Sequence, residues 1–214
     1  MTVNEAYFEQ MFADSDDPWS FRTRWYEQRK RALIMACLPR QHYERIFEPA
    51  CANGELSALL AERASSLLSQ DVNAKAVMLT RDRLSGVAHA NVNQASLPKD
   101  WPPGRFDLIV LGEIGYYLTP TQWQTVIERC RNSLTAEGGV LACHWLAPIE
   151  GCPQTGREVH ERLRENLGMS RLIKHEEPDF ILEYWTVRPF RFDLSERTAS
   201  CEDSACRSLS SETR

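Results

Sequence analysis

Two acidic residues about 20 positions apart, Glu48 and Asp71, are placed to bind a ligand that contains adenosine. Each ends a short apolar run, and the turn at residues 49–54 consists mostly of small residues. Small residues let the backbone approach a ligand closely, and an acid at the tip of the following strand suits the hydroxyls of a ribose. The spacing therefore predicts a strand, turn, helix and strand that together bind a nucleoside.

The turn does not suit a dinucleotide, because Gly54 is the only glycine between Glu48 and Asp71. A pyrophosphate needs a glycine-lined cradle, and the carboxylate of Glu48 would repel it. The same carboxylate suits a cationic amine, and S-adenosylmethionine (SAM) carries an adenosine, an amino acid end and no phosphate. We therefore expect SAM as the cofactor and disfavour a nicotinamide-linked reductase. Asp71 and Val72 are expected at the ribose, and the methionine end is expected at Glu48, Ala50, Cys51 and Gly54.

Other candidate cofactor contacts come from three separate parts of the chain. The first 30 residues are rich in aromatic and charged side chains, and they predict a helical cover over the ligand pocket. Its rings could close over a nucleoside or simply pack on the sheet, and an arginine fork could pair with a ligand carboxylate. Residues 94–98 follow a predicted strand beside the adenine, where a side chain or amide could read the base. These candidates are Trp19, Arg22, Arg29, Ser96, Leu97 and Gly112.

Alternating apolar strand and helix patterns must position these residues. Residues 106–111 form a nearly continuous apolar run, which is typical of a central parallel strand buried on both faces. Helices are predicted at 27–38, 73–84, 120–134 and 158–167, with the third stopped at 137–139. Strands are predicted at 89–93 and 140–145, and the runs 170–175 and 180–187 predict an antiparallel hairpin. This alternation indicates an α/β fold with a doubly wound sheet.

Length and charge favour one domain that handles a small molecule. The chain has 214 residues, a formal charge of −5 and a pI near 5.6, which argues against a nucleic-acid partner. We expect one domain at residues 1–192, with a helical cover at about 1–40 and a disordered tail at 193–214. No apolar run suits a membrane span or a signal peptide, so a cytoplasmic location is expected. Seven scattered cysteines favour reduced thiols, and no ligand spacing indicates a metal.

Four segments together resemble the nodulation protein S family of SAM-dependent methyltransferases over about residues 7–187. They read YFEQMFADSDDPWSFRTRWYEQRKRAL, FEPACANGELSALLA, LPKDWPPGRFDLIVLGEIGYYL and CHWLAPIEGCPQTGREVH. The resemblance implies a Rossmann-like seven-stranded sheet of order 3-2-1-4-5-7-6 with the last strand antiparallel. It also implies methyl transfer to the free amine of a deacetylated chitooligosaccharide or a related amino sugar. Ala50 departs from the usual glycine, and Ser96 stands where many members of the superfamily carry an acid.

Amine methylation needs a neutral nitrogen lone pair aligned with the methyl carbon. His144 is the first candidate for the base or for a group that orients the acceptor, and Glu113 is the second. Tyr116 and Tyr117 would position the amine or stack on a sugar face. The alternative for His144 is a hydrogen-bonded histidine at a strand end without a role in proton transfer. For Glu113 the alternative is a helix or loop cap, and for the two tyrosines it is packing in the pocket wall.

The expected partner is a small-molecule or oligosaccharide amine, with no nucleic acid and no membrane, and the expected state is a monomer or weak homodimer. Two rival functions stay open. One is a SAM-dependent methyltransferase of another small acceptor, and the other is a catalytically degenerate SAM-binding module.

Overall fold

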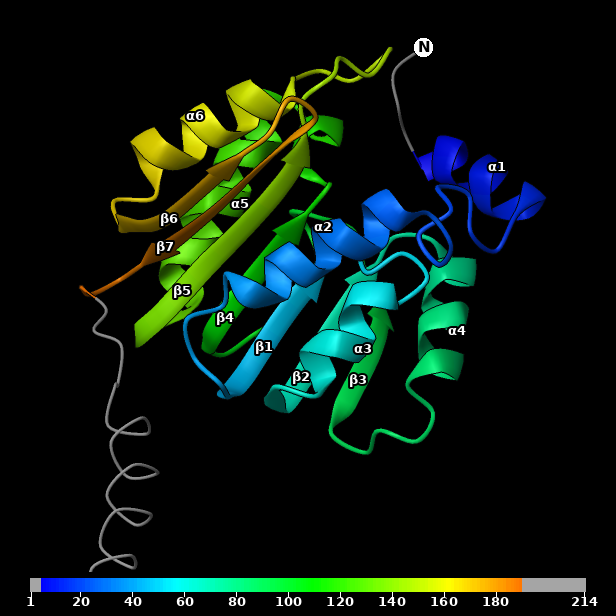
Figure 1. The fold of residues 1–214 in the computed structure, drawn as a ribbon, viewed down its shortest axis with the longest axis horizontal. Coiled ribbons are helices and arrows are strands. Elements are labelled where there is room, and N and C mark those ends of the chain that lie inside the picture. The colour runs from blue at the N-terminus through cyan, green and yellow to red at the C-terminus, as the bar shows by residue number, and fades with distance from the viewer. Residues whose placement is uncertain (1–4, 190–214) are drawn as a thin grey trace, which may run out of the picture.

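The computed structural model describes residues 5–189 (Figure 1). Its helices are α1 (Glu5–Asp14), α2 (Trp25–Ala36), α3 (Glu55–Ala61), α4 (Ala74–Arg83), α5 (Pro120–Ser133) and α6 (Gly156–Asn166), with a 3-10 turn, η1 (Gly115–Tyr117). Its strands are β1 (Tyr43–Pro49), β2 (Ala64–Asp71), β3 (Ala90–Gln94), β4 (Phe106–Gly112), β5 (Leu134–Trp145), β6 (Ser170–Glu176) and β7 (Phe180–Thr186). The tail predicted at 193–214 lies outside the described residues.

The seven strands form one sheet of order β3-β2-β1-β4-β5-β7-β6. Strands β3, β2, β1, β4 and β5 run parallel, and β7 pairs antiparallel with both β5 and β6. The predicted fold, strand order and antiparallel last strand are confirmed. Because β1 and β4 are neighbours and the chain winds away from them in opposite directions, their carboxyl ends form the switch point where such sheets bind ligands.

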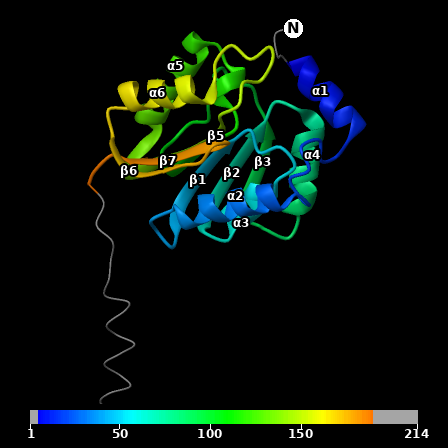
Figure 2. The ribbon, with the colours of Figure 1, turned by 45° about the horizontal axis from the view of Figure 1, so that its top comes forward.

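Helices cover both faces of the sheet, so two apolar cores form. Figures 1 and 2 show α2 and α3 on one face and α5 and α6 on the other. Ile34 of α2 and Leu60 of α3 belong to the first core, and Trp123 of α5 and Val159 of α6 belong to the second. Strand β4 supplies Leu108 to the first core and Ile109 to the second, as expected for a strand buried on both faces.

Local signals at the helix ends match the structure closely. The side chain of Asn73 accepts hydrogen bonds from the amides of Lys75 and Ala76, so it caps α4 as predicted. Thr119 forms a capping box with Gln122, and Pro120 occupies the first turn of α5. These caps fix where α4 and α5 begin, and therefore where the preceding loops must end.

The predicted stop at residues 137–139 is wrong, because β5 already begins at Leu134. Leu134 pairs with Phe106, whereas Gly139 pairs with Leu108, so β5 contains an irregularity with extra residues. A side chain at Gly139 would collide with the ring of Tyr184 on β7. The glycine therefore serves the close approach of two strands and does not end a helix.

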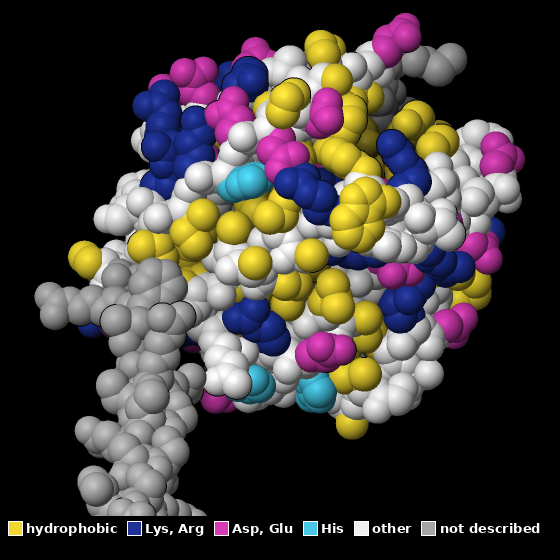
Figure 3. Space-filling view, in the orientation of Figure 1, with side chains coloured by type: hydrophobic (Ala, Val, Ile, Leu, Met, Phe, Trp, Pro, Cys, Tyr) yellow, Lys and Arg dark blue, Asp and Glu magenta, His cyan; other side chains and the backbone are white. Residues whose placement is uncertain are grey.

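Acidic and basic side chains are interspersed on the face that Figure 3 shows, and no single basic patch dominates it. Within residues 5–189, no helix has both the length and the apolar character needed to cross a bilayer.

Candidate functional site

A cavity of about 970 Å³ opens at the carboxyl ends of β1, β2 and β4. Its walls come from α1, from the connection between α1 and α2 (residues 15–24, here called the strap), from α2, from the turn after β1, and from η1. Ligand pockets typically have volumes of about 300–1,000 Å³. The cavity is therefore large enough for a nucleoside cofactor together with part of an acceptor.

Most of the residues predicted from the sequence meet at this cavity. They are Trp19, Glu48, Ala50, Cys51, Asp71, Val72, Ser96, Leu97, Gly112, Glu113, Tyr116 and Tyr117. Four predicted residues do not line it: Arg22, Arg29, Gly54 and His144. Each of these four has another role, described below.

The turn after β1 is left-handed at every second residue. The backbone φ is +60° at Ala50, +49° at Ala52 and +77° at Gly54. Side chains disfavour this region because Cβ approaches the neighbouring carbonyl oxygen, whereas glycine adopts it freely. Gly54 does not contact the cavity, but a side chain there would press on Thr80 of α4, so its role is close packing of the turn.

Replacing Ala50 with glycine is expected to stabilise the protein, because it relieves the left-handed strain. We expect the free energy of unfolding to rise by about 0.5–1 kcal/mol for Ala50→Gly. Urea denaturation measures this change. The control Ala58→Gly lies inside α3 and should destabilise by about 1 kcal/mol. Equal losses for both variants would show that the turn carries no such strain.

Glu48 is a buried carboxylate at the tip of β1. The hydroxyls of Ser57 and Ser69 donate to its Oε2 at 2.5 Å and 2.8 Å. Burial raises the pKa of Glu48 to about 7, although these two hydrogen bonds act in the opposite direction. Among the described residues nothing bonds to Oε1, so this oxygen is available to a cationic ligand.

Asp71 ends β2 and links the turn to the next helix. Its Oδ2 accepts from the Ala52 amide at 2.9 Å and its Oδ1 accepts from the Asn73 amide at 2.9 Å. Burial raises the pKa of Asp71, while the backbone hydrogen bonds lower it. A carboxylate has about four acceptor positions, so two remain for the hydroxyls of a diol.

The loop after β3 offers fewer groups that could bind adenine than the sequence predicted. The Ser96 amide donates to Oδ2 of Asp100 at 3.0 Å, so this amide is already used inside its own loop. Of the two amides proposed to read adenine, the one on Leu97 stays a candidate.

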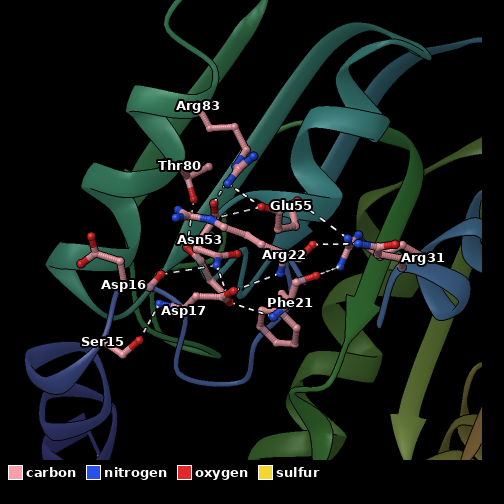
Figure 4. A network of polar contacts seen from close by, with 12 residues as sticks. Ser15, Asp16, Asp17, Phe21, Arg22, Arg31, Asn53, Glu55, Thr80 and Arg83 are labelled. Atoms are coloured by element: carbon pink, nitrogen blue, oxygen red, sulfur yellow. Dashed lines mark hydrogen bonds and ion pairs between the residues drawn. The ribbon is translucent and has the colours of Figure 1, made fainter. Parts of the chain in front are cut away.

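The strap is fastened to the turn by polar contacts (Figure 4). The Asn53 side chain donates to Oδ1 of Asp17 at 2.9 Å, and the Phe21 amide donates to the same oxygen at 2.8 Å. Glu55 pairs with three arginines of different elements, which are Arg22, Arg31 and Arg83. Glu55 holds the guanidinium of Arg22 in this network, and Arg22 is not among the residues that line the cavity.

Arg29 is also turned away from the cavity. Its two terminal nitrogens donate to the carboxylate of Glu177 at 2.8 Å and 2.7 Å, a bidentate pair between α2 and the β6–β7 hairpin. Arg24 lines the cavity instead. Within residues 5–189 no acid pairs with it, and its guanidinium lies 5.8 Å from the Tyr26 ring centroid. Arg24 was not among the residues predicted from the sequence, because the path of the strap decides which arginine faces the cavity.

Glu113 is held by three donors and is therefore not a free base. Nζ of Lys30 lies 2.6 Å from its Oε1, while the Tyr116 hydroxyl and the Trp145 amide donate to Oε2 at 2.6 Å and 2.9 Å. Its φ of +53° is left-handed, so the surrounding contacts impose this conformation. Glu113 thus joins α2, η1 and the end of β5 at the cavity wall.

His144 is wholly buried behind η1, so the prediction that it acts as the base is wrong. Its Nε2 accepts from the Gly115 amide at 3.0 Å, which requires the proton on Nδ1. His144 Nδ1 then donates to His160 Nε2 at 3.0 Å, and His160 Nδ1 donates to Glu183 at 2.6 Å. Burial, with His160 and Lys30 nearby, lowers the pKa of His144 well below its usual range. The neutral ring therefore fixes η1 and does not face a substrate.

Two buried side-chain oxygens at the cavity have no partner among the described residues. They are Oε1 of Gln70 and Oδ1 of Asn53, and both residues line the cavity. Buried polar atoms are usually hydrogen-bonded, so these two oxygens mark polar positions in the residues of the cavity wall. Among the lining residues, Glu48, Asp71 and Arg24 fit a ligand with an amine, a diol and a carboxylate.

The sequence profile of the nodulation protein S family matches residues 4–141 of the chain. Nodulation protein S of Sinorhizobium fredii (strain NBRC 101917 / NGR234) is 30% identical over 117 residues, which is 54% of each chain. Nodulation protein S of Rhizobium tropici is 30% identical over 105 residues, 49% of this chain and 44% of that protein. The chain thus aligns with about half the length of these curated relatives.

Two solved structures are similar over most of the chain. A Pseudomonas syringae protein, assigned provisionally as a methyltransferase, is 49% identical with a TM-score of 0.69, covering 76% of this chain and 99% of that one. The N-methyltransferase NodS from Bradyrhizobium japonicum WM9, bound to S-adenosyl-L-homocysteine (SAH), is 21% identical with a TM-score of 0.77. That match covers 85% of this chain and 96% of that one, and it shows a shared fold.

Proposed function

The chain belongs to the nodulation protein S family, and from that premise we propose that it is a SAM-dependent methyltransferase. The proposed acceptor is the free amine of a deacetylated chitooligosaccharide or a related amino sugar. The observation that carries the cofactor assignment is the pair of buried carboxylates, Glu48 and Asp71, at adjacent strand tips of one cavity. The Bradyrhizobium relative that binds SAH and the provisional assignment of the Pseudomonas protein support it.

In this proposal each part of the cofactor meets a different group of the chain. Asp71 binds the ribose diol, Glu48 faces the amine of the methionine end, and Arg24 pairs with its carboxylate. Leu97 lies beside the adenine, and Trp19 covers the ligand from the strap. When bound, SAM supplies the methyl group as an electrophile. The chain supplies binding and orientation.

Aromatic side chains form part of the cavity wall and suit the flat face of a sugar. Phe8 and Tyr117 meet edge to face with ring centroids 4.9 Å apart, and Tyr7 and Trp145 also line the cavity. These rings present large apolar faces, and the tyrosines and Trp145 also carry a polar group. This wall supports an acceptor that carries both an apolar face and hydrogen-bonding groups.

Formation of SAH with candidate acceptors tests the activity. We expect turnover with the fully deacetylated chitin tetramer and none with the fully acetylated tetramer, because only the former carries free amines. Turnover only with a panel of small amines, alcohols or thiols would keep the methyltransferase and reject the sugar. The left-handed φ of Ala50 and Ala52 favours a second candidate, the degenerate SAM-binding module. Tight SAH binding without turnover of any acceptor would select that candidate.

Replacing Arg24 with alanine is expected to weaken SAH binding by about 10- to 30-fold, because a charge-assisted hydrogen bond to the ligand carboxylate is lost. Calorimetry with SAH measures this loss. Methylthioadenosine, which lacks the amino acid end, is the matched ligand and should bind wild type and Arg24→Ala equally. Equal weakening of both ligands would place Arg24 elsewhere on the cofactor or assign it a purely structural role.

A further inference from the structure

Three charged side chains meet at the cavity wall above β4 and β5, and we call them the triad: Glu27, Lys30 and Glu113. Nζ of Lys30 lies 2.6 Å from Oε1 of Glu113 and 3.1 Å from Oε2 of Glu27. The side chains of Glu27 and Lys30 are only 8% and 6% exposed. All three residues line the cavity. The side chain of Glu113 is 24% exposed, so the triad is a mostly buried ionic cluster that opens to the cavity.

The triad contains two carboxylates and one ammonium. Burial alone would lower the pKa of Lys30, but the carboxylates of Glu113 and Glu27 outweigh it and keep the amine protonated. The cluster then carries one excess negative charge in a largely desolvated place, and an uncompensated buried charge is costly. A cationic group of a ligand would restore the balance.

The two carboxylates of the triad differ in how they are used. Glu113 accepts from Lys30, from the Tyr116 hydroxyl and from the Trp145 amide, so both its oxygens are occupied. Glu27 has Lys30 as its sole side-chain partner among the described residues, and Lys30 stands closer to Glu113. Glu27 is therefore the carboxylate with capacity left for another donor.

The triad lies on the acceptor side of the switch point. Glu48 and Asp71 end β1 and β2, whereas Glu113 follows β4, and the charge of Glu27 acts on Cys143 of β5. The ionisable groups near Glu27 include Lys30 and Tyr26 on its own helix, Glu113 and Cys143 at the strand tips, and Arg24, which lines the same cavity and whose carbonyl accepts from the Glu27 amide. Because Asp71 is assigned to the ribose and Glu48 to the amine of the methionine end, the cation that meets Glu27 is assigned to the acceptor.

We propose that Glu27 is a catalytic residue that binds the ammonium of the acceptor and takes one of its protons, while Lys30 and Glu113 hold Glu27 in place. This inference rests on the proposed methyltransferase function. An N–H bond of the ammonium breaks, its electron pair stays on nitrogen, and the proton passes to the Glu27 carboxylate. Once the nitrogen has been methylated, the amine product is again a cation, and the Glu27 carboxyl releases the proton to solvent. The released proton balances the positive charge that enters with the methyl donor.

Three measurements on Glu27→Gln, which keeps the size and removes the charge, test the inference. SAH binding by calorimetry should stay within about threefold of wild type, since Glu27 does not face the cofactor. Binding of benzylamine and of the deacetylated chitin tetramer to SAH-loaded protein should weaken at least about tenfold, while neutral benzyl alcohol should be unaffected. The rate with the amine should fall roughly 100-fold or more, and kcat/KM should lose the acidic limb of its pH profile.

Two further variants keep the test decisive. Glu27→Asp retains the charge, so it should keep the acidic limb and most of the amine affinity, which a purely structural role of Glu27 would not produce. Glu44→Gln removes an exposed acid at the start of β1 and should change none of these measurements.

Several outcomes would overturn the inference, and they can be told apart from failure of the proposed function. If SAH binding to Glu27→Gln weakens tenfold or more, Glu27 holds the amine of the cofactor. If SAH-loaded wild type binds neither amine, or if Glu27→Gln binds and methylates both normally, the ammonium site is rejected while the cofactor assignment stands. Failure of wild type to bind SAH at all would instead reject the proposed function.

Discussion

Asp71→Asn is expected to weaken SAH binding by about 100-fold, the largest single effect on cofactor affinity. Two charge-assisted hydrogen bonds from the ribose hydroxyls contribute about 3 kcal/mol, which corresponds to this factor. The asparagine also meets the Ala52 and Asn73 amides, which need acceptors, with one oxygen where the aspartate has two. Calorimetry with SAH measures the affinity, and adenine alone, which lacks the ribose, serves as the matched ligand.

Asp107→Asn is the matched control for this loss. Asp107 is another acid of the sheet that accepts from a backbone amide, that of Arg45, and from the hydroxyl of Thr135. It lies near the amino end of β4, at the opposite edge of the sheet from the cavity. SAH affinity should not change in this variant. A similar loss in both variants would mean that affinity follows sheet stability and not contact with Asp71.

Glu48→Gln is expected to raise stability and lower cofactor affinity together, with a dependence on pH. Burial lifts the pKa of Glu48 from 4.5 to about 7, so the folded protein holds this proton more tightly than the unfolded chain does. Stability is therefore lost as pH rises from 4.5 through 7, because the buried carboxyl must ionise. Glutamine never ionises, so above pH 7 the variant should be more stable by on the order of 3 kcal/mol.

The same ionised carboxylate is what attracts the cationic cofactor. SAM affinity of wild type should fall as pH drops below about 7, because Glu48 becomes protonated there. SAM binding to Glu48→Gln should be at least about tenfold weaker at pH 8 and nearly independent of pH around neutrality. Urea denaturation and calorimetry at pH 5 and pH 8 measure both effects. Equal stability of the two proteins at pH 8, or equal SAM affinity, would contradict this role of Glu48.

Residues at strand tips were predictable because strand patterns locate the tips. Glu48, Asp71 and Gly112 each follow an apolar run, and parallel strands bring their carboxyl ends to one edge of the sheet. The alternation of side chains along a strand could have excluded His144 from the cavity. Side chains change face at every residue of a strand, so if Cys143 faces the cavity, His144 faces the opposite layer. The left-handed φ of Ala50 and Ala52 had no sequence signal, because alanine disfavours this region.

The arginines were not predictable from their residue types. Arg22, Arg24 and Arg29 have the same chemistry, and the path of the strap decides which of them meets an acid. Ser20 in the strap has a left-handed φ of 58°, and no local sequence pattern predicts this conformation. The triad had a partial signal, because Glu27 and Lys30 stand three residues apart on a helix, but their contact with Glu113 depends on tertiary packing.

The central claim is that one cavity at the switch point of the sheet holds a phosphate-free adenosine between Glu48 and Asp71. A crystal structure of the protein with SAH tests it most directly. We expect the ribose hydroxyls within hydrogen-bonding distance of Asp71, the amino acid end between Glu48 and Arg24, and the sulfur facing the side of the cavity that Glu113 and Tyr117 line. SAH bound elsewhere, or both carboxylates without contact to it, would contradict the claim.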